Sequence, residues 1–177
     1  MTRRGDWIQT YSGRAFWPLD PRAEDVELAD IAHSLAHQCR FAGHCLKFYS
    51  VAEHSVILSR FVSKRAALAA LLHDAGEAYL VDLPRPIKRA IPQYRAAEDA
   101  VFAAIAERFQ LDGIPDEVHE ADRRILTDEM RANMAAPPAP WSTAAEPLGI
   151  RLHYWSPMEA RRAFIARFNE LAEGGAR

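Results

Sequence analysis

The stretch Ala66-Ala67-Leu68-Ala69-Ala70-Leu71-Leu72-His73-Asp74-Ala75-Gly76 decides how this chain folds. Residues 66–72 are the longest unbroken apolar run, and residues 64–75 are almost wholly apolar beyond Arg65. A helix with this pattern is apolar on most of its sides, so other elements must cover it. Gly76 stands where helices commonly end. We therefore predict a buried helix over residues 64–75 that ends in an adjacent His and Asp.

The composition favours further helices around this one. Alanine supplies 32 of the 177 residues, whereas Val, Ile and Thr together supply 21. Ala loses no side-chain entropy in a helix, while β-branched residues do. The length corresponds to roughly one domain at about 150 residues per domain. We expect an all-α fold, a compact helical bundle.

Apolar residues at helical spacing continue on both sides of the central run. Ser50, with Glu53 three residues later, forms a capping-box pattern that begins a second helix. The inward stripe of that helix is expected to be Val51, His54, Leu58 and Phe61. Further helices are predicted at residues 24–38, 93–110, 116–134 and 157–173, with a short turn at 87–90.

The two ends of the chain follow a different pattern. Residues 7–19 predict a small β-hairpin, because aromatic flanks surround the turn pair Ser12-Gly13. Residues 135–140 (Ala-Ala-Pro-Pro-Ala-Pro) cannot be helical and form a stiff link. The residues after this link are too few to fold alone. We expect a single domain over residues 1–177, with a core at about 24–134 and a C-terminal helix at 157–173.

Charge and cysteine content exclude several classes of protein. Lys plus Arg number 22 and Asp plus Glu number 24, so the net charge of −2 gives no general attraction to nucleic acid or to an acidic membrane. Two cysteines, Cys39 and Cys45, are too few for a disulfide scaffold. No signal peptide and no bilayer-spanning run are visible. We expect a cytoplasmic protein that binds neither nucleic acid nor membrane.

Ionisable residues stand where the helical patterns call for apolar ones. His54 and Asp122 occupy inward positions of their helices, and the most apolar helix ends in His73-Asp74. Burying an unpaired carboxylate costs several kcal/mol, so an inward Asp needs a partner. Two His and two Asp form a ligand set suited to Mn, Fe, Co, Zn or, less well, Mg. Together these residues favour one divalent metal ion.

Structural alternatives exist for each residue taken alone. A buried His such as His54 is usually a satisfied core histidine, and Asp122 could pair with Arg123, Arg124 or another Arg. A structural zinc is a second alternative, at His37, Cys39, His44 and Cys45, although no CxxC spacing is present. His33 and His37 have helical i, i+4 spacing, but no Glu follows His33 as a metalloprotease motif requires.

The surroundings of these residues resemble a known family. The pattern His54, His73-Asp74, Asp122 is similar to that of the HD-domain metal-dependent phosphohydrolases. Residues 50–55 (Ser-Val-Ala-Glu-His-Ser) and 73–88, which begin His-Asp-Ala-Gly-Glu, closely resemble the branch of bacterial 5′-deoxynucleotidases and small phage deoxyadenosine triphosphate triphosphohydrolases. Residues 5–21 also resemble the short phage-type members. The resemblance covers roughly residues 5–130.

This resemblance implies roles for particular residues. The metal ligands would be His54, His73, Asp74 and Asp122. Glu77 would act on the attacking water or the leaving oxygen, and Asp82 would orient water or a sugar hydroxyl, unless Asp82 only caps a helix before Leu83-Pro84.

The substrate contacts follow from the same resemblance. Arg40 suits a phosphate oxygen. Phe41 stands where the deoxynucleotidases have Trp, so it keeps a stacking surface without the indole N–H. His44 would contact phosphate or substrate, and Lys88 would be a second phosphate contact or else a solvated turn residue.

The function implied is hydrolysis of a deoxynucleotide phosphate. The phage-like start favours a deoxynucleoside triphosphate such as dATP as substrate. The alternatives are a 5′-deoxynucleotidase acting on monophosphates and a nucleotide-binding module without turnover. His119 is the only further His between Asp74 and Asp122, which favours one metal over two and disfavours a cyclic-nucleotide phosphodiesterase. The resemblance also implies self-association into a dimer or larger oligomer.

Overall fold

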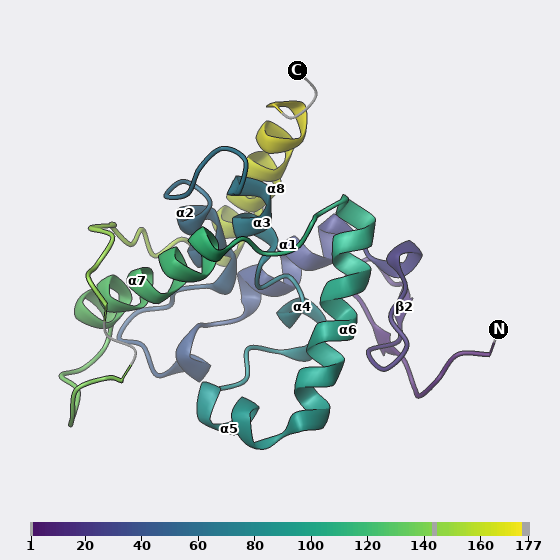
Figure 1. The fold of residues 1–177 in the computed structure, drawn as a ribbon, viewed down its shortest axis with the longest axis horizontal. Helices are drawn as coiled ribbons and strands as arrows, with labels where there is room; N and C mark the ends of the chain where they lie inside the picture. Colours follow the sequence, from purple (N-terminus) through teal and green to yellow (C-terminus); the bar gives the residue numbers. More distant parts are fainter. Residues whose placement is uncertain (1, 143–144, 175–177) are drawn as a thin grey trace.

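The computed structural model describes residues 2–142 and 145–174. These residues are mostly helical, with a small two-stranded antiparallel sheet near the N-terminus (Figure 1). The predicted all-α class with an N-terminal hairpin is confirmed. Within the described ranges, no helix is long and apolar enough to cross a membrane.

The N-terminal hairpin is short and anchored to the core. Strand β1 (Ile8–Gln9) pairs with β2 (Ala15–Phe16), with Ile8 opposite Phe16. Gly13 turns the chain at a φ of +82°, which glycine adopts without steric cost. Phe16 is fully buried, and its ring stacks on Tyr79 with 3.8 Å between centroids. The stacking fixes the hairpin against the helices.

The helices follow the predicted order with changed boundaries. Their bounds are η1 (Ala23–Asp25), α1 (Leu28–His37), η2 (Phe41–Gly43), α2 (Val51–Leu58), α3 (Ala67–Leu72), α4 (Glu77–Leu80), α5 (Arg85–Ala90), α6 (Pro92–Phe109), α7 (Asp116–Asn133) and α8 (Pro157–Gly174). The helix predicted at 24–38 begins as the separate 3-10 turn η1. The helix predicted at 64–75 is only α3, because the chain turns on both sides of it.

One inward position was predicted wrongly. Phe61 is 47% exposed, since α2 ends at Leu58. The backbone N–H of Phe61 donates to the carbonyl of Leu58 in a turn that carries the chain away from the core. The N-terminal end of α2 is as predicted, because the Ser50 hydroxyl accepts a hydrogen bond from the N–H of Glu53 at 3.1 Å.

Helix α2 lies at the centre of the molecule, and each of its residues is buried. Helix α8 packs across α1, α2 and α3, so the segment after the proline-rich link covers the core. Ala160 and Phe164 are its fully buried residues, while the predicted inward residues Ile165, Phe168 and Leu171 pack partly buried beside them. The division into one domain stays a prediction.

The loop before α8 is tied to α2 by a buried carboxylate. Glu53 is fully buried and accepts hydrogen bonds from three consecutive backbone N–H groups. Those of His153 and Tyr154 donate to Oε1 at 2.6 and 2.9 Å, and that of Trp155 donates to Oε2 at 2.7 Å. Glu53 therefore satisfies donors that packing would otherwise leave without partners.

Candidate metal centre

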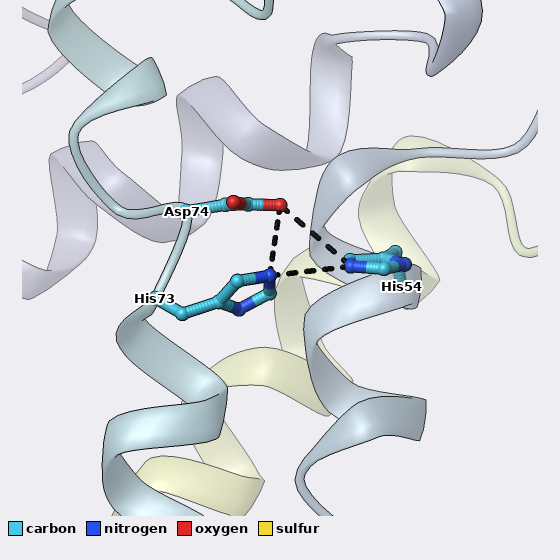
Figure 2. A group of neighbouring side chains, drawn as sticks. All are labelled: His54, His73 and Asp74. Atoms are coloured by element: carbon cyan, nitrogen blue, oxygen red, sulfur yellow. Dashed lines mark hydrogen bonds and ion pairs between the residues drawn. The ribbon is translucent and has the colours of Figure 1, made fainter. Parts of the chain in front are cut away.

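Four side chains from three parts of the chain meet here: His54, His73 and Asp74 form one close group, and Asp122 lies against the two histidines. His54 comes from α2, His73 and Asp74 follow α3 directly, and Asp122 comes from α7. Nε2 of His54 lies 3.3 Å from Nε2 of His73 and 3.4 Å from Oδ1 of Asp122. Oδ2 of Asp74 lies 3.2 Å from His73 Nε2 and 3.7 Å from His54 Nε2. Figure 2 shows His54, His73 and Asp74 pointing toward one another.

The end of α3 explains how neighbouring residues reach the same point. Successive side chains in a regular helix point about 100° apart, so His73 and Asp74 would diverge if α3 continued. Helix α3 instead ends at Leu72, and a turn follows in which Ala75 N–H donates to Leu72 O at 3.0 Å. The turn brings both side chains to one side.

The hydrogen bonds made by the two Nδ1 atoms determine which nitrogen of each imidazole ring carries the lone pair. His73 Nδ1 lies 2.8 Å from the carbonyl of Ala70, and His54 Nδ1 lies 2.7 Å from Oε1 of Glu129. A carbonyl or a carboxylate only accepts, so both Nδ1 atoms carry protons. In the neutral rings, both Nε2 lone pairs then face the convergence point. Two lone pairs 3.3 Å apart repel unless a cation lies between them.

The pKa values at the site show the same demand for positive charge. Burial and Arg40 lower the pKa of His54, but Glu129 and Asp122 outweigh them and raise it to about 9. Burial would raise the pKa of Asp74, but His73, His54 and Arg40 hold it well below its usual range. A proton thus takes the place of a cation on His54. Two imidazole nitrogens and two carboxylates fit a divalent transition metal.

Glu129 and Arg40 form a buried layer behind these donors. Glu129 is fully buried and lies 3.1 Å from Arg40, whose other terminal nitrogen lies 3.5 Å from Asp74. Burial opposes ionisation of Glu129, but Arg40 and His54 lower its pKa overall. Sequence reasoning gave Glu129 no role. The available signal was a carboxylate on the inward stripe of a helix, two turns after Asp122.

Glu77 lies beside the convergence point on α4. Its side chain is buried, its Oε1 lies 3.7 Å from Nζ of Lys88, and its Oε2 has no hydrogen-bond partner among the residues that the structure describes. Burial, followed by the charges of Asp74 and Asp82, raises its pKa well above the usual value. A cavity of about 230 Å³ is lined by His73, Asp74, Glu77 and Lys88, among others.

The structure decides two of the alternatives left by the sequence. Helix α5 begins after Pro84 without a side-chain cap, so Asp82 is not its N-cap. Lys88 is not a free turn residue, because its Nζ lies 2.7 Å from Glu98 as well as near Glu77.

Phe41 and His44 lie in and just after η2, a turn in which Phe41 and Ala42 have φ values of 56° and 51°. The Phe41 ring lies 5.4 Å from the Arg40 guanidinium and 6.0 Å from the Trp141 ring. His44 is exposed, and within the described ranges its ring makes no hydrogen bond or ion pair with the four converging side chains.

Pairing of Asp122 with either neighbouring arginine does not fit the contacts. Arg123 pairs with Glu120, and Arg124 donates to the carbonyls of Glu146 and Pro147, so neither is a partner of Asp122. His119 is exposed.

The zinc alternative also fails on geometry. Cys39 and Cys45 lie close, with 3.5 Å between their sulfurs, but His37 donates to the carbonyl of His33. In the part of the chain that the structure describes, the one group of three or more His, Cys, Asp or Glu ligand atoms close enough to hold a metal is His54, His73 and Asp74.

Comparison with known proteins gives relatives over the whole chain and over part of it. No family model matches. The uncharacterized protein YfdR of Escherichia coli is 36% identical over 171 residues, which cover 94% of this chain and 96% of the relative. An uncharacterized protein of Rhodobacter capsulatus is 34% identical, covering 93% and 95%. A 5′-deoxynucleotidase of Photorhabdus temperata is 35% identical over 114 residues, 63% of this chain and only 53% of that enzyme.

Proposed function

We propose that this chain, which belongs to the family of the uncharacterized Escherichia coli protein YfdR, is a metal-dependent phosphohydrolase of nucleotides. One observation carries the proposal: two imidazoles held in the metal-binding tautomer converge with two carboxylates beside a buried Glu and Arg. The partial similarity to proteins named 5′-deoxynucleotidases supports the same reaction class.

In this proposal His54, His73, Asp74 and Asp122 hold one divalent ion. The bound metal supplies a water of lowered pKa and polarises a phosphoryl oxygen. Glu129 orients His54 by accepting its Nδ1 proton, and Ala70 does the same for His73. Such partners hold a ligand ring in place and raise its basicity.

Glu77 is assigned the proton transfer. Burial and the charges of Asp74 and Asp82 raise its pKa well above the usual value, which favours the protonated carboxyl, and among the described residues its Oε2 has no hydrogen-bond partner. A protonated carboxyl donates to the ester oxygen as that oxygen leaves phosphorus. The charge of Asp82 helps to raise the pKa of Glu77, and we assign Asp82 to orient water or a sugar hydroxyl.

Arg40, Phe41, His44 and Lys88 are assigned to the substrate. Arg40 is buried, and among the described residues its Nε has no hydrogen-bond partner, so this guanidinium has a donor beyond its pairs with Glu129 and Asp74. A guanidinium suits a phosphate oxygen. Phe41 beside it offers a ring on which a base can stack. Lys88, paired with Glu98 and near Glu77, places positive charge at the cavity.

A 2′-deoxynucleoside 5′-monophosphate is the preferred substrate. The start of the sequence favours a triphosphate, but the named relatives are 5′-deoxynucleotidases, and the monophosphate fits those names better. Triphosphate hydrolysis remains the second candidate because of the phage-like residues 5–21.

The test is hydrolysis by the purified, metal-stripped protein after addition of Mn²⁺, Co²⁺ or Mg²⁺. Phosphate release from deoxy- and ribonucleoside monophosphates is compared with triphosphate release from deoxynucleoside triphosphates. Turnover of deoxynucleoside monophosphates is expected. No turnover of any nucleotide with any of the metals would overturn the enzyme proposal and favour a binding module.

The ligand assignment has a separate test. Asp74→Ala should lose bound metal and activity while its circular dichroism stays helical. Asp112→Ala, which changes an exposed carboxylate, is the control. Metal content that survives Asp74→Ala would contradict the assignment.

A further inference from the structure

The segment from Glu77 to Asp82 contains a strained residue. Val81 has φ 72° and ψ 149°, a conformation that is otherwise almost confined to glycine. Its side chain is 60% exposed, so burial of the valine does not explain why the chain adopts this shape. The surrounding contacts must hold the segment in place.

Gln38, the C-cap residue directly after α1, contacts both ends of the segment from Glu77 to Asp82. Its Nε2 donates to the carbonyl of Glu77 at 2.9 Å, and its Oε1 accepts from the N–H of Asp82 at 3.1 Å. Its Nε2 also lies 3.0 Å from the Ser34 hydroxyl, which orients the amide. One side chain thus sets the separation between Glu77 and Asp82.

Tyr94, on α6, holds the middle of the segment. Its hydroxyl lies 2.6 Å from the carbonyl of Val81 and 3.0 Å from that of Leu80. Burial and the charge of Glu98 raise the pKa of Tyr94 to about 12, so the phenol keeps its proton and acts as a donor. The strained backbone at Val81 is therefore held by hydrogen bonds from Gln38, at the end of α1, and from Tyr94 on α6.

We propose that Gln38 and Tyr94 are positioning residues that hold Asp82 at the catalytic site through the strained Val81 backbone. This inference rests on the proposed function, in which Asp82 and Glu77 act on one substrate. Neither Gln38 nor Tyr94 contacts the four converging side chains within the part of the chain described. The Tyr94 ring also lies 5.9 Å from Nζ of Lys88, and Tyr94→Phe leaves that ring in place, so this variant tests the hydroxyl contacts to the segment.

The kinetic test uses Gln38→Met, which removes both amide contacts at similar length, and Tyr94→Phe, which removes only an oxygen. Each should lower kcat for a deoxynucleoside monophosphate by roughly tenfold or more, with a smaller change in KM, because small misplacements slow catalysis strongly. Arg108→Met is the matched control, because it removes a hydrogen bond from α6 to a different backbone carbonyl, that of Val26.

Hydrogen exchange gives a readout that does not require activity. The amide of Asp82 should exchange at least tenfold faster in Gln38→Met than in the unchanged protein, and no faster in Arg108→Met. Unchanged exchange at Asp82, or kcat losses no larger than those of Arg108→Met, would overturn the inference. If the unchanged protein hydrolyses no nucleotide, the proposed function fails, while the exchange comparison still decides whether Gln38 holds Asp82. If Gln38→Met does not fold, exchange at Val81 and Asp82 in Tyr94→Phe decides instead.

Discussion

His54 shows how one residue couples a proton to a metal. It is fully buried, with Glu129 on Nδ1 and the other converging side chains around Nε2. A raised pKa means that the metal-free site carries a proton on this ring at neutral pH. A metal must displace that proton to bind Nε2.

Metal affinity should therefore depend on pH. The His54 pKa is raised to about 9, so below this value each bound metal releases one proton from His54, and affinity rises by about tenfold per pH unit. Calorimetric titration with Mn²⁺ between pH 6.5 and 9, in buffers of different ionisation enthalpy, measures both the affinity and the protons released. An affinity that is constant over this range would contradict the assignment of His54 as a ligand.

Glu129 should contribute to metal binding without touching the metal. Glu129→Gln weakens the acceptor of the His54 Nδ1 proton and removes the charge that faces Arg40. We expect metal affinity to fall about tenfold to hundredfold. A competition assay with a chromophoric chelator measures it. Glu120→Gln, on the same helix but exposed, is the control and should leave the affinity unchanged.

The strained backbone at Val81 should lower the free energy of unfolding of the protein. Val81→Gly removes the steric cost of φ 72° and loses little burial, so it should raise the free energy of unfolding by about 1 kcal/mol. Ile91→Gly is the matched control, because Ile91 is also exposed but has an ordinary φ of −121°. Urea unfolding measures both, and the control should lose stability. Equal losses in the two variants would show that Val81 is not strained.

Among the helices around the site, the point at which α3 ends determines where His73, Asp74 and Glu77 lie. The apolar pattern over 64–75 predicts one continuous helix, but α3 ends at Leu72 and α4 begins at Glu77. The break lets His73 and Asp74 face the same point and places Glu77 beside them. Helical periodicity alone does not place the end of α3 at Leu72, because Ala75 continues the apolar pattern past His73 and Asp74.

The attachment of the C-terminal loop to α2 depends on Glu53. Glu53→Gln replaces one of the accepting oxygens by an amide nitrogen, which leaves a buried N–H of residues 153–155 facing another donor. We expect the free energy of unfolding to fall by about 1–3 kcal/mol. Urea titration followed by circular dichroism measures the loss. Glu24→Gln, at an exposed side chain, should have no comparable effect, and equal stabilities would contradict the role of Glu53.

At the scale of the whole molecule, α8 completes the core around the site. Phe164 is fully buried in the same cluster as Val51 and Leu72, on the two helices that bring His54 and His73 together. Figure 1 shows α8 beside α2 and α3. The segment after the proline-rich link is therefore part of the support of the site.

Removing this segment should abolish both the fold and the site. A chain ending at Ala136 exposes the apolar faces of α1, α2 and α3, which α8 covers in the full protein. We expect no cooperative thermal transition and no Mn²⁺ binding, measured by circular dichroism and by metal analysis. A truncated chain that melts cooperatively and binds metal would contradict this and show that residues 1–136 fold without α8.

The helical class, the hairpin and the four candidate ligands at or beside inward positions follow from the amino-acid sequence, because helical periodicity and caps are local properties of the chain. The hydrogen-bond partners of the residues at the site follow only from the tertiary structure. Glu129 meets His54 across 75 residues, and Gln38 meets the Glu77 carbonyl across 39. Such hydrogen bonds exist only once α1, α2, α4 and α7 have packed, since no local pattern specifies which buried groups will meet. The strain at Val81 has the same origin, because contacts from α1 and α6 impose a backbone shape that valine does not favour.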